Sequence, residues 1–258
     1  MKQKIMVVAL LLLCKLSFTQ KLDAYEKHLL IQGKDTLPYR LLLPVDYDSS
    51  KKYPLIFFLH GAGERGNDNE AQLTHGAKLF LKEEVSTTYP AIVVFPQCPA
   101  NSFWSNVNFK MENNNRVFIF QNGGQPTFAM KMAQDLLMTI VQTYPVKRDQ
   151  VYVAGLSMGG MGTFEMVSRN SGLFAAAIPI CGGGSVEAAK YMTNTKWWVF
   201  HGAKDNVVPP NYSEEMVKAL KDANAIVKFT LYPEASHNSW DPAFAEPGLL
   251  AWLFSQHK

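Results

Sequence analysis

A serine hydroxyl stands between glycines in the stretch VYVAGLSMGG, residues 151–160. The apolar residues up to Ala154 predict a buried strand, and the residues from Met158 onward predict a helix. The G-x-S-x-G sequence of residues 155–159 therefore lies on a strand-to-helix turn, which is the context of a nucleophile elbow. Such a turn exposes the serine at a helix start, where the helix dipole favours developing negative charge. The pattern predicts that Ser157 is a nucleophile.

A serine needs a general base, usually a histidine held by a carboxylate. Of the histidines after Ser157, His237 is the best candidate because it follows the last predicted strand. His201 ends a strand, so we expect it to pack or hydrogen-bond there. Asp205 follows the preceding strand and is the predicted acid, which gives the order serine, acid, histidine along the chain.

These assignments have simpler alternatives. Asp205 could initiate a turn or cap a helix, and His237 could be a surface loop residue. The rival acids Glu187, Glu214, Glu215 and Asp222 all fall in helix-like segments, where a solvated face is the simpler explanation.

Attack on a carbonyl creates an oxyanion, which needs fixed hydrogen-bond donors. The stretch FFLHGAGERG ends a predicted strand in a tight turn, whose backbone N–H groups can point into a site. We predict the amides of Ala62 and Met158 as the two donors, with Gly63 as the alternative to Ala62. A glycine turn that only closes a strand–helix unit is the competing interpretation.

Three aromatic residues, Phe103, Trp104 and Trp240, are candidates to line a cleft for a sugar or phenolic group. Trp240 lies three residues beyond the predicted base, which favours a position near the site. Packing in the core or scattered surface positions would explain the same residues. No Cys/His cluster with ligand spacing is present in the sequence, so we predict neither a metal nor a cofactor.

Short apolar segments alternate with amphipathic ones along the chain. Strands are predicted at 25–31, 39–44, 53–60, 91–96, 150–155, 174–180, 196–202 and 227–233. Helices are predicted at 69–85, 126–145, 158–170, 211–224 and near the carboxyl terminus. This alternation predicts an α/β fold with a mostly parallel central sheet of about eight strands and helices on both faces.

The segment 101–125 is polar, Asn-rich and without a clear period. It is either a solvated loop or an excursion that shapes a substrate cleft, since long loops in compact domains tend to be functional.

The first residues, MKQKIMVVALLLLCKLSFTQ, combine a basic start, a short apolar run and small residues at Ser17 and Thr19. This pattern predicts a signal peptide over 1–19 and a secreted or periplasmic protein, with 20–258 as a single catalytic domain. A buried helix or an uncleaved anchor is the alternative. Lipidation at Cys14 is not expected, because Leu13 before it is too bulky.

The 258 residues are 47% hydrophobic and 18% charged, with a net charge of +3. This composition supports a sizeable core and gives no basic patch for nucleic acid. No stable membrane insertion is expected, because the apolar run is too short to span a bilayer. The oligomeric state, and whether Cys98 and Cys181 form a disulfide, stay open.

The stretches HGAGERG, PQCP, GLSMGGMGTF, IPICGGG, FHGAKDNVVP and SHNSW resemble the α/β-hydrolase superfamily. The closer likeness is to secreted bacterial esterases of the feruloyl, acetyl-xylan and polyhydroxybutyrate-depolymerase type, and to the phospholipase/carboxylesterase group. This resemblance covers residues 57 to 240. It implies Ser157 as nucleophile, Asp205 as acid and His237 as base.

The sequence predicts a serine hydrolase that cleaves esters through an acyl-enzyme, with small-molecule or polysaccharide esters as substrates. One alternative is a peptidase of the prolyl-oligopeptidase kind, against which the chain lacks room for a large gating domain. Another is a non-catalytic carbohydrate- or lipid-binding protein on the same fold, which would have no use for a nucleophile, base and acid.

Overall fold

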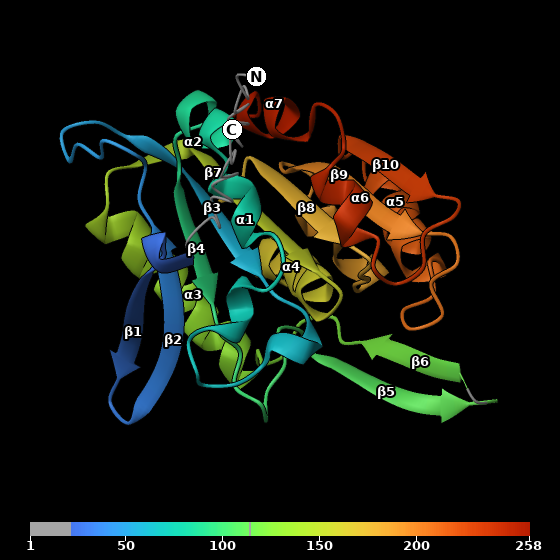
Figure 1. Ribbon diagram of the computed structural model, residues 1–258. Coiled ribbons are helices and arrows are strands. Elements are labelled where there is room, and N and C mark those ends of the chain that lie inside the picture. Colours follow the sequence, from blue (N-terminus) through green and yellow to red (C-terminus); the bar gives the residue numbers. More distant parts are fainter. Residues whose placement is uncertain (1–21, 114) are drawn as a thin grey trace, which may run out of the picture.

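A computed structural model describes residues 22–113 and 115–258 of the protein. Its centre is an eight-stranded sheet with the strand order β1-β2-β4-β3-β7-β8-β9-β10 (Figure 1). The strands are β1 (Glu26–Gln32), β2 (Asp35–Leu42), β3 (Tyr53–Leu59), β4 (Ile92–Pro96), β7 (Val146–Leu156), β8 (Ala176–Ile180), β9 (Lys196–Gly202) and β10 (Val227–Tyr232). The predicted signal peptide, 1–19, lies outside the described residues.

The sheet confirms the predicted class. β2 pairs antiparallel with β1 and with β4, and the remaining neighbours from β4 through β10 are parallel. Each of the eight predicted strand segments overlaps one strand of this sheet. Parallel strands must be covered on both faces, which explains why β3 is buried along its whole length and is encoded as a continuous apolar run.

Helices cover both faces of the sheet. The side chains of Leu55, Phe57 and Leu59 point to one face and join α3 (Phe128–Thr143), α4 (Met158–Arg169) and α5 (Asn211–Asp222) in one core. Ile56 and Phe58 point to the other face. There they pack with α1 (Ala77–Phe80), α2 (Glu83–Thr88), α6 (Trp240–Phe244) and α7 (Leu249–Phe254). The alternation along β3 therefore builds two cores from one strand.

The prediction of one continuous helix over 69–85 is wrong. The segment forms a 3₁₀ turn, η3 (Ala71–Leu73), and the separate helices α1 and α2. Gly76 has a φ of 82°, outside the helical region, and a Cβ at this position would meet the rings of Phe58 and Phe244 at 3.1 Å. Packing of the backbone against these two rings interrupts the helix.

The segment 101–125 is not an irregular loop. Strands β5 (Val107–Glu112) and β6 (Asn115–Phe120) pair as an antiparallel hairpin that projects away from the main sheet (Figure 1). Phe118 anchors the hairpin by packing with Met161 and Val208. Its backbone N–H donates to the Tyr212 hydroxyl at 2.9 Å.

Two open questions concern cysteines and membranes. Within the described part of the chain, Cys98 and Cys181 are both buried free thiols. None of the described helices is long and apolar enough to span a membrane.

Candidate active site

Ser157 occupies a strained turn between β7 and α4. Its φ of 54° and ψ of −117° are rare for a residue with a side chain, and its N–H is held by the Ile180 carbonyl at 2.9 Å. The turn also brings two backbone segments into contact. A Cβ on Gly159 would lie 1.9 Å from the Leu59 oxygen, and one on Gly155 would lie 2.3 Å from the Gly159 oxygen. Only glycine fits at either position.

The structure brings Ser157, His237 and Asp205 into one hydrogen-bonded chain. Ser157 Oγ lies 2.9 Å from His237 Nε2, and His237 Nδ1 lies 2.8 Å from Asp205 Oδ2. Because the carboxylate can only accept, Nδ1 carries the ring proton and Nε2 of the neutral ring is free to accept from the serine. This is the tautomer that a general base beside a nucleophile requires.

The loops after β9 and β10 meet through backbone hydrogen bonds. Ala203 N–H donates to the Tyr232 carbonyl at 2.9 Å, and Lys204 N–H donates to the Ala235 carbonyl at 3.0 Å. These bonds join the loop that carries Asp205 to the loop that carries His237. Both loops follow the carboxyl ends of neighbouring parallel strands, which explains their convergence at one edge of the sheet.

Asp205 is held by several donors. Its Oδ1 accepts from the N–H groups of Val207 and Val208 at 2.9 and 3.0 Å. Burial alone would raise the pKa of Asp205, but the hydrogen bonds from His201, His237 and Val208 outweigh it, so that the pKa lies well below its usual range. The side chain therefore stays an anion that can support positive charge on His237.

His201 has a larger role than the sequence indicated. Its fully buried Nε2 lies 3.2 Å from Asp205 Oδ2 and 2.8 Å from the Val208 carbonyl, and its Nδ1 lies 2.7 Å from the Ser213 hydroxyl. Since both neighbours of Nε2 are acceptors, this nitrogen carries a proton and donates. We expected His201 to hydrogen-bond at the strand end, and the structure shows that one of its partners is Asp205, the predicted acid. No feature of the sequence indicates this partner.

The turn predicted to hold the oxyanion follows β3. Ala62 and Met158 both line the cleft at Ser157. His60, which precedes this turn, donates from Nδ1 to the Gly61 carbonyl at 2.6 Å, and its Nε2 accepts from the Cys98 N–H at 2.9 Å. Burial lowers the pKa of His60 to about 4, so that the ring is neutral and braces the turn.

The cleft around Ser157 has a volume of about 460 Å³. Phe103 and Trp240 line it, as expected, and the Trp240 ring meets the His237 ring edge-on at 5.5 Å. Three residues of the hairpin also line the cleft, namely Phe109, Arg116 and Phe118. The sequence analysis did not identify any of them as a site residue. Their apolar–polar alternation, as in VNFKME, is the signal that could have indicated strands.

The assignment of Trp104 to the cleft is wrong. The residue is completely buried and belongs to the core between the sheet and its helices. Its indole N–H donates to the His60 carbonyl at 3.2 Å. A Cβ on Gly162 would come within 2.5 Å of the Trp104 Cβ, so the absence of a side chain on α4 makes room for Trp104 beneath the site. Trp104 therefore supports the floor of the site without reaching substrate.

One group in the described chain has metal-ligand geometry. Ligand atoms of Cys181, Asp205 and His237 lie within 4.8 Å of one another. However, Asp205 and His237 already hydrogen-bond to each other, and burial raises the pKa of the Cys181 thiol. A metal needs the thiolate form, so the hydrogen-bonded chain explains this cluster better than a metal does.

Comparison with known protein families identifies the family of this chain. Residues 34–214 match the Esterase family, described as "Putative esterase". The chain belongs to the Esterase family. It is 33% identical to a solved thermostable esterase, with a TM-score of 0.81 over 92% of this chain and 64% of that one. The chain thus has the α/β-hydrolase fold.

Two curated relatives of this esterase-family chain come from Aspergillus terreus. It is 25% identical to a probable feruloyl esterase C over 201 residues, which are 75% of this chain and 64% of the relative. It is 26% identical to a probable dipeptidyl-peptidase 5 over 175 residues, which are 64% of this chain and 22% of the relative. The chain therefore spans less than two thirds of the length of either relative.

Proposed function

We propose that the protein is a serine hydrolase that cleaves carboxylic esters through an acyl-enzyme, with residues 20–258 as its catalytic domain. The hydrogen-bonded chain from Ser157 through His237 to Asp205 is the observation that carries this proposal. Membership of the Esterase family supports it.

In the proposed reaction, Ser157 Oγ attacks the ester carbonyl while His237 Nε2 takes its proton. The backbone amides of Ala62 and Met158 stabilise the oxyanion. His237 then returns the proton to the leaving alcohol, and Asp205 stabilises the imidazolium that forms between these steps. Water, deprotonated by His237, releases the acid from the acyl-enzyme and restores the serine.

We infer that the substrates are acetyl or feruloyl esters of plant polysaccharides. The relative named as a probable feruloyl esterase supports a phenolic acyl group. The cleft fits this class, because Phe103, Phe118 and Trp240 offer aromatic surface beside Ser157.

The test is hydrolysis of p-nitrophenyl acetate and methyl ferulate by the wild type and by Ser157→Ala. We expect the substitution to reduce turnover by several orders of magnitude, and to abolish labelling by a fluorophosphonate. Ser86→Ala, which removes a half-buried hydroxyl on α2 that donates to the Glu83 carbonyl, is the matched control and should change neither readout. Wild-type turnover in Ser157→Ala would refute the proposal.

A peptidase is the second candidate, favoured by the 26% identity to the probable dipeptidyl-peptidase 5. The same serine, base and acid can cleave amides. Assays of dipeptide p-nitroanilides beside the esters separate the two candidates, and faster cleavage of the amides would favour the peptidase. A non-catalytic binding protein would show neither activity nor fluorophosphonate labelling.

We also propose export with cleavage after Thr19. The basic, apolar and small-residue order of residues 1–19 supports this location. Mass spectrometry of the protein from the periplasm or medium should give a mature chain that starts at Gln20. A chain that keeps Met1 and stays inside the cell would contradict it.

A further inference from the structure

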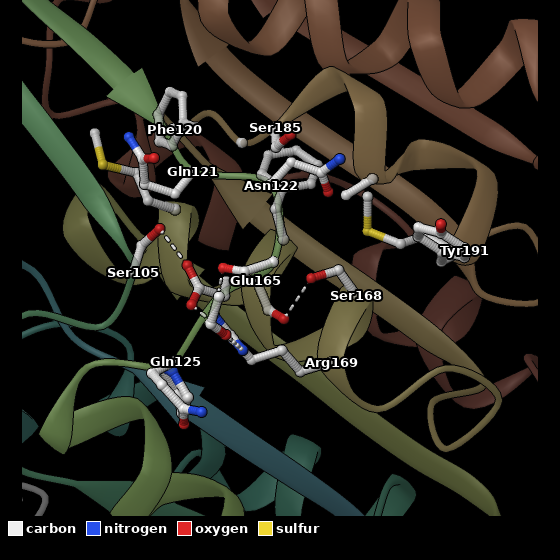
Figure 2. A pocket seen from close by; sticks show the side chains of 18 of the residues that line it. Ser105, Phe120, Gln121, Asn122, Gln125, Glu165, Ser168, Arg169, Ser185 and Tyr191 are labelled. Atoms are coloured by element: carbon white, nitrogen blue, oxygen red, sulfur yellow. Dashed lines mark hydrogen bonds and ion pairs between the residues drawn. The ribbon is translucent and has the colours of Figure 1, made fainter.

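A second cavity has a volume of about 550 Å³, and Figure 2 shows the side chains that line it. Its walls are the chain that follows the hairpin (121–125), one side of α4 and the 3₁₀ turn η4 (Val186–Tyr191). None of the three proposed catalytic residues lines it. The volume is typical of a site for a small organic ligand, and the proposed ester chemistry does not use it.

The two cavities share a wall. Met161, one turn into α4, lines both of them. On strand β6, Phe118 lines the catalytic cleft and Phe120 lines the second cavity. Glu165, in the wall of the second cavity, follows Ser157 by eight residues, which is about 12 Å along a helix. A substrate longer than one unit, held at Ser157, could therefore extend into the second cavity.

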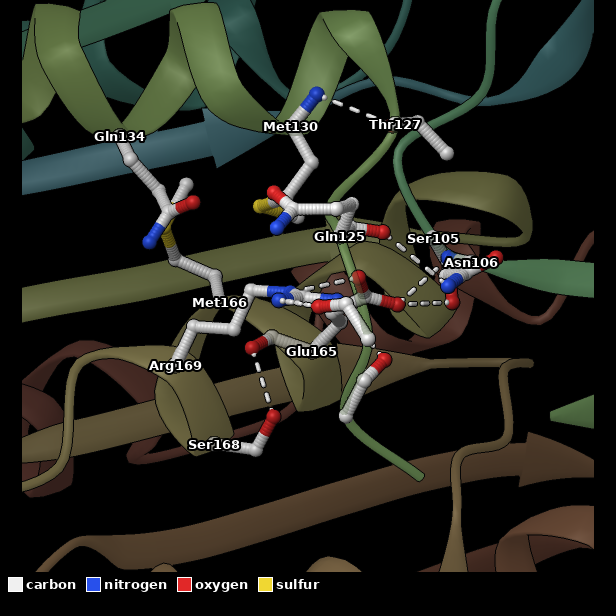
Figure 3. A network of polar contacts seen from close by, with 12 residues as sticks. Ser105, Asn106, Gln125, Thr127, Met130, Gln134, Glu165, Met166, Ser168 and Arg169 are labelled. Carbon is white, nitrogen blue, oxygen red and sulfur yellow. Dashed lines mark hydrogen bonds and ion pairs between the residues drawn. The ribbon is translucent and has the colours of Figure 1, made fainter. Parts of the chain in front are cut away.

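A polar network fixes the shape of the second cavity (Figure 3). Glu165 accepts from the Ser105 hydroxyl at 2.8 Å, from the Asn106 N–H at 2.5 Å and from Arg169 Nε at 2.7 Å. Arg169 also donates to the carbonyls of residues 124 and 123 at 3.0 and 3.3 Å. This largely buried ion pair holds the segments before and after the hairpin against α4, so the cavity is preformed.

The network also determines which ligands the cavity suits. The charges of Glu165 and Arg169 compensate each other, and the Lys131 ammonium is paired with Asp135. The remaining polar groups are neutral amides and hydroxyls, at Gln121, Asn122, Gln125, Gln134, Ser168 and Ser185. Among the described residues that line this cavity, the charged side chains are all paired, so the lining suits a neutral polar ligand better than an ionic one.

Sugars match this lining. Each hydroxyl of a sugar both donates and accepts, as a side-chain amide also does. The C–H faces of a sugar ring are apolar and pack on aromatic rings, which Phe120 and Tyr191 provide at opposite parts of the wall. Tyr191 is 53% exposed, and the Lys190 ammonium lies 5.1 Å from the centre of its ring.

We infer that the second cavity binds neutral sugar units that neighbour the esterified unit of a polysaccharide substrate. This inference rests on the proposed ester hydrolysis at Ser157. In this arrangement the glycan chain binds in the second cavity, and the acyl group binds in the catalytic cleft beside Trp240. Short esters then use only the cleft, and longer substrates use both cavities.

The test compares substrates of different length. The variant Gln125→Ala/Tyr191→Ala removes one amide and one ring at exposed positions, neither in the proposed catalytic machinery. We expect its kcat/KM for p-nitrophenyl acetate to stay at the wild-type value. For acetylated xylohexaose, kcat/KM should fall at least about fivefold, as for loss of contacts worth 1 kcal/mol or more. Gln142→Ala, at an exposed position on α3, is the matched control and should change neither value.

Binding of unesterified xylohexaose tests the cavity without catalysis. By titration calorimetry, Ser157→Ala should bind this probe, and the triple variant with Gln125→Ala and Tyr191→Ala should bind it at least about fivefold more weakly. Unchanged kcat/KM for acetylated xylohexaose in the double variant, or no binding of xylohexaose to Ser157→Ala, would overturn the inference. If the wild type fails to cleave p-nitrophenyl acetate, ester hydrolysis fails as a proposal, while calorimetry still decides whether the cavity binds sugar.

Discussion

His201 Nε2 lies 3.2 Å from the carboxylate of Asp205, and both side chains are completely buried. Asp205 Oδ2 is thus shared by two histidines, His201 behind it and His237 toward the cleft. One histidine holds the acid and the other is held by it. The proposed base is therefore positioned by two layers of hydrogen bonds that reach from the cleft into the core.

Substitutions at these two residues should differ in their effects. Asp205→Asn keeps the shape but removes the charge and can present a donor to His237, which favours the wrong tautomer. We expect kcat for p-nitrophenyl acetate to fall by about 10⁴-fold. His201→Phe removes the donor behind Asp205 and the partner of the Val208 carbonyl, while the Ser213 hydroxyl can still donate to the Gly182 carbonyl at 2.8 Å, so we expect a smaller loss of kcat. Its free energy of unfolding should fall by about 1–3 kcal/mol per unpaired group.

Kinetics and urea unfolding of both variants check this difference. Equal losses of kcat in the two variants would show that His201 acts as directly as Asp205. An unchanged kcat in Asp205→Asn would remove Asp205 from the proposed machinery and point to a different acid.

The buried His60 should make stability depend on pH. Burial lowers the pKa of His60 to about 4, from an ordinary value of 6.5. The unfolded chain therefore binds a proton more readily than the native state. The contribution of neutral His60 to stability is complete above pH 6.5 and is lost as the pH falls toward 4. The shift corresponds to about 3 kcal/mol.

His60→Gln is the matched variant, since a glutamine oxygen can still accept from the Cys98 N–H but does not titrate. The difference in unfolding free energy between wild type and variant should be constant above pH 6.5. It should then change in favour of the variant by about 3 kcal/mol toward pH 4. Urea titrations at several pH values measure it. A difference that is independent of pH would show that His60 is already charged in the native state or is not buried.

Substitutions of Trp104 and Trp240, which the sequence analysis assigned to the same cleft, should have different effects. Trp104 is fully buried under the site, and Trp240 lines the cleft against His237. Trp104→Ala should lower the free energy of unfolding by about 3–5 kcal/mol. Trp240→Ala should lower it less and should mainly raise KM for methyl ferulate. A larger loss of unfolding free energy in Trp240→Ala, with a raised KM in Trp104→Ala, would contradict the placement of both residues.

Much of the fold could be predicted because buried strands and helix faces require apolar residues at regular positions in the sequence. A parallel strand covered on both faces, such as 53–59, must be apolar throughout. Residues 157 and 205 follow the buried ends of β7 and β9, and residue 237 follows the partly exposed last strand, β10. All three could be found because parallel strands end at one edge of the sheet.

Other features depend on contacts that the sequence does not encode locally. Gly76 breaks a helix because of two distant rings, Phe58 and Phe244. Trp104 belongs to the core because Gly162 leaves space for it on another element. The second cavity requires the hairpin, α4 and η4 to meet, and no single segment indicates that meeting.

The close approach of β3 and α4 at the elbow gives a last prediction. A Cβ on Gly159 would lie 1.9 Å from the Leu59 oxygen and 2.7 Å from the His60 oxygen, both backbone atoms that cannot move without shifting β3. Gly159→Ala should therefore displace α4, which begins directly after Ser157, and abolish turnover of p-nitrophenyl acetate. Gly63→Ala is the matched control, because a Cβ there meets nothing within 4 Å. We expect Gly63→Ala to keep its fold. Full activity in Gly159→Ala would mean that the elbow is looser than its geometry requires, and circular dichroism would separate a local displacement from global unfolding.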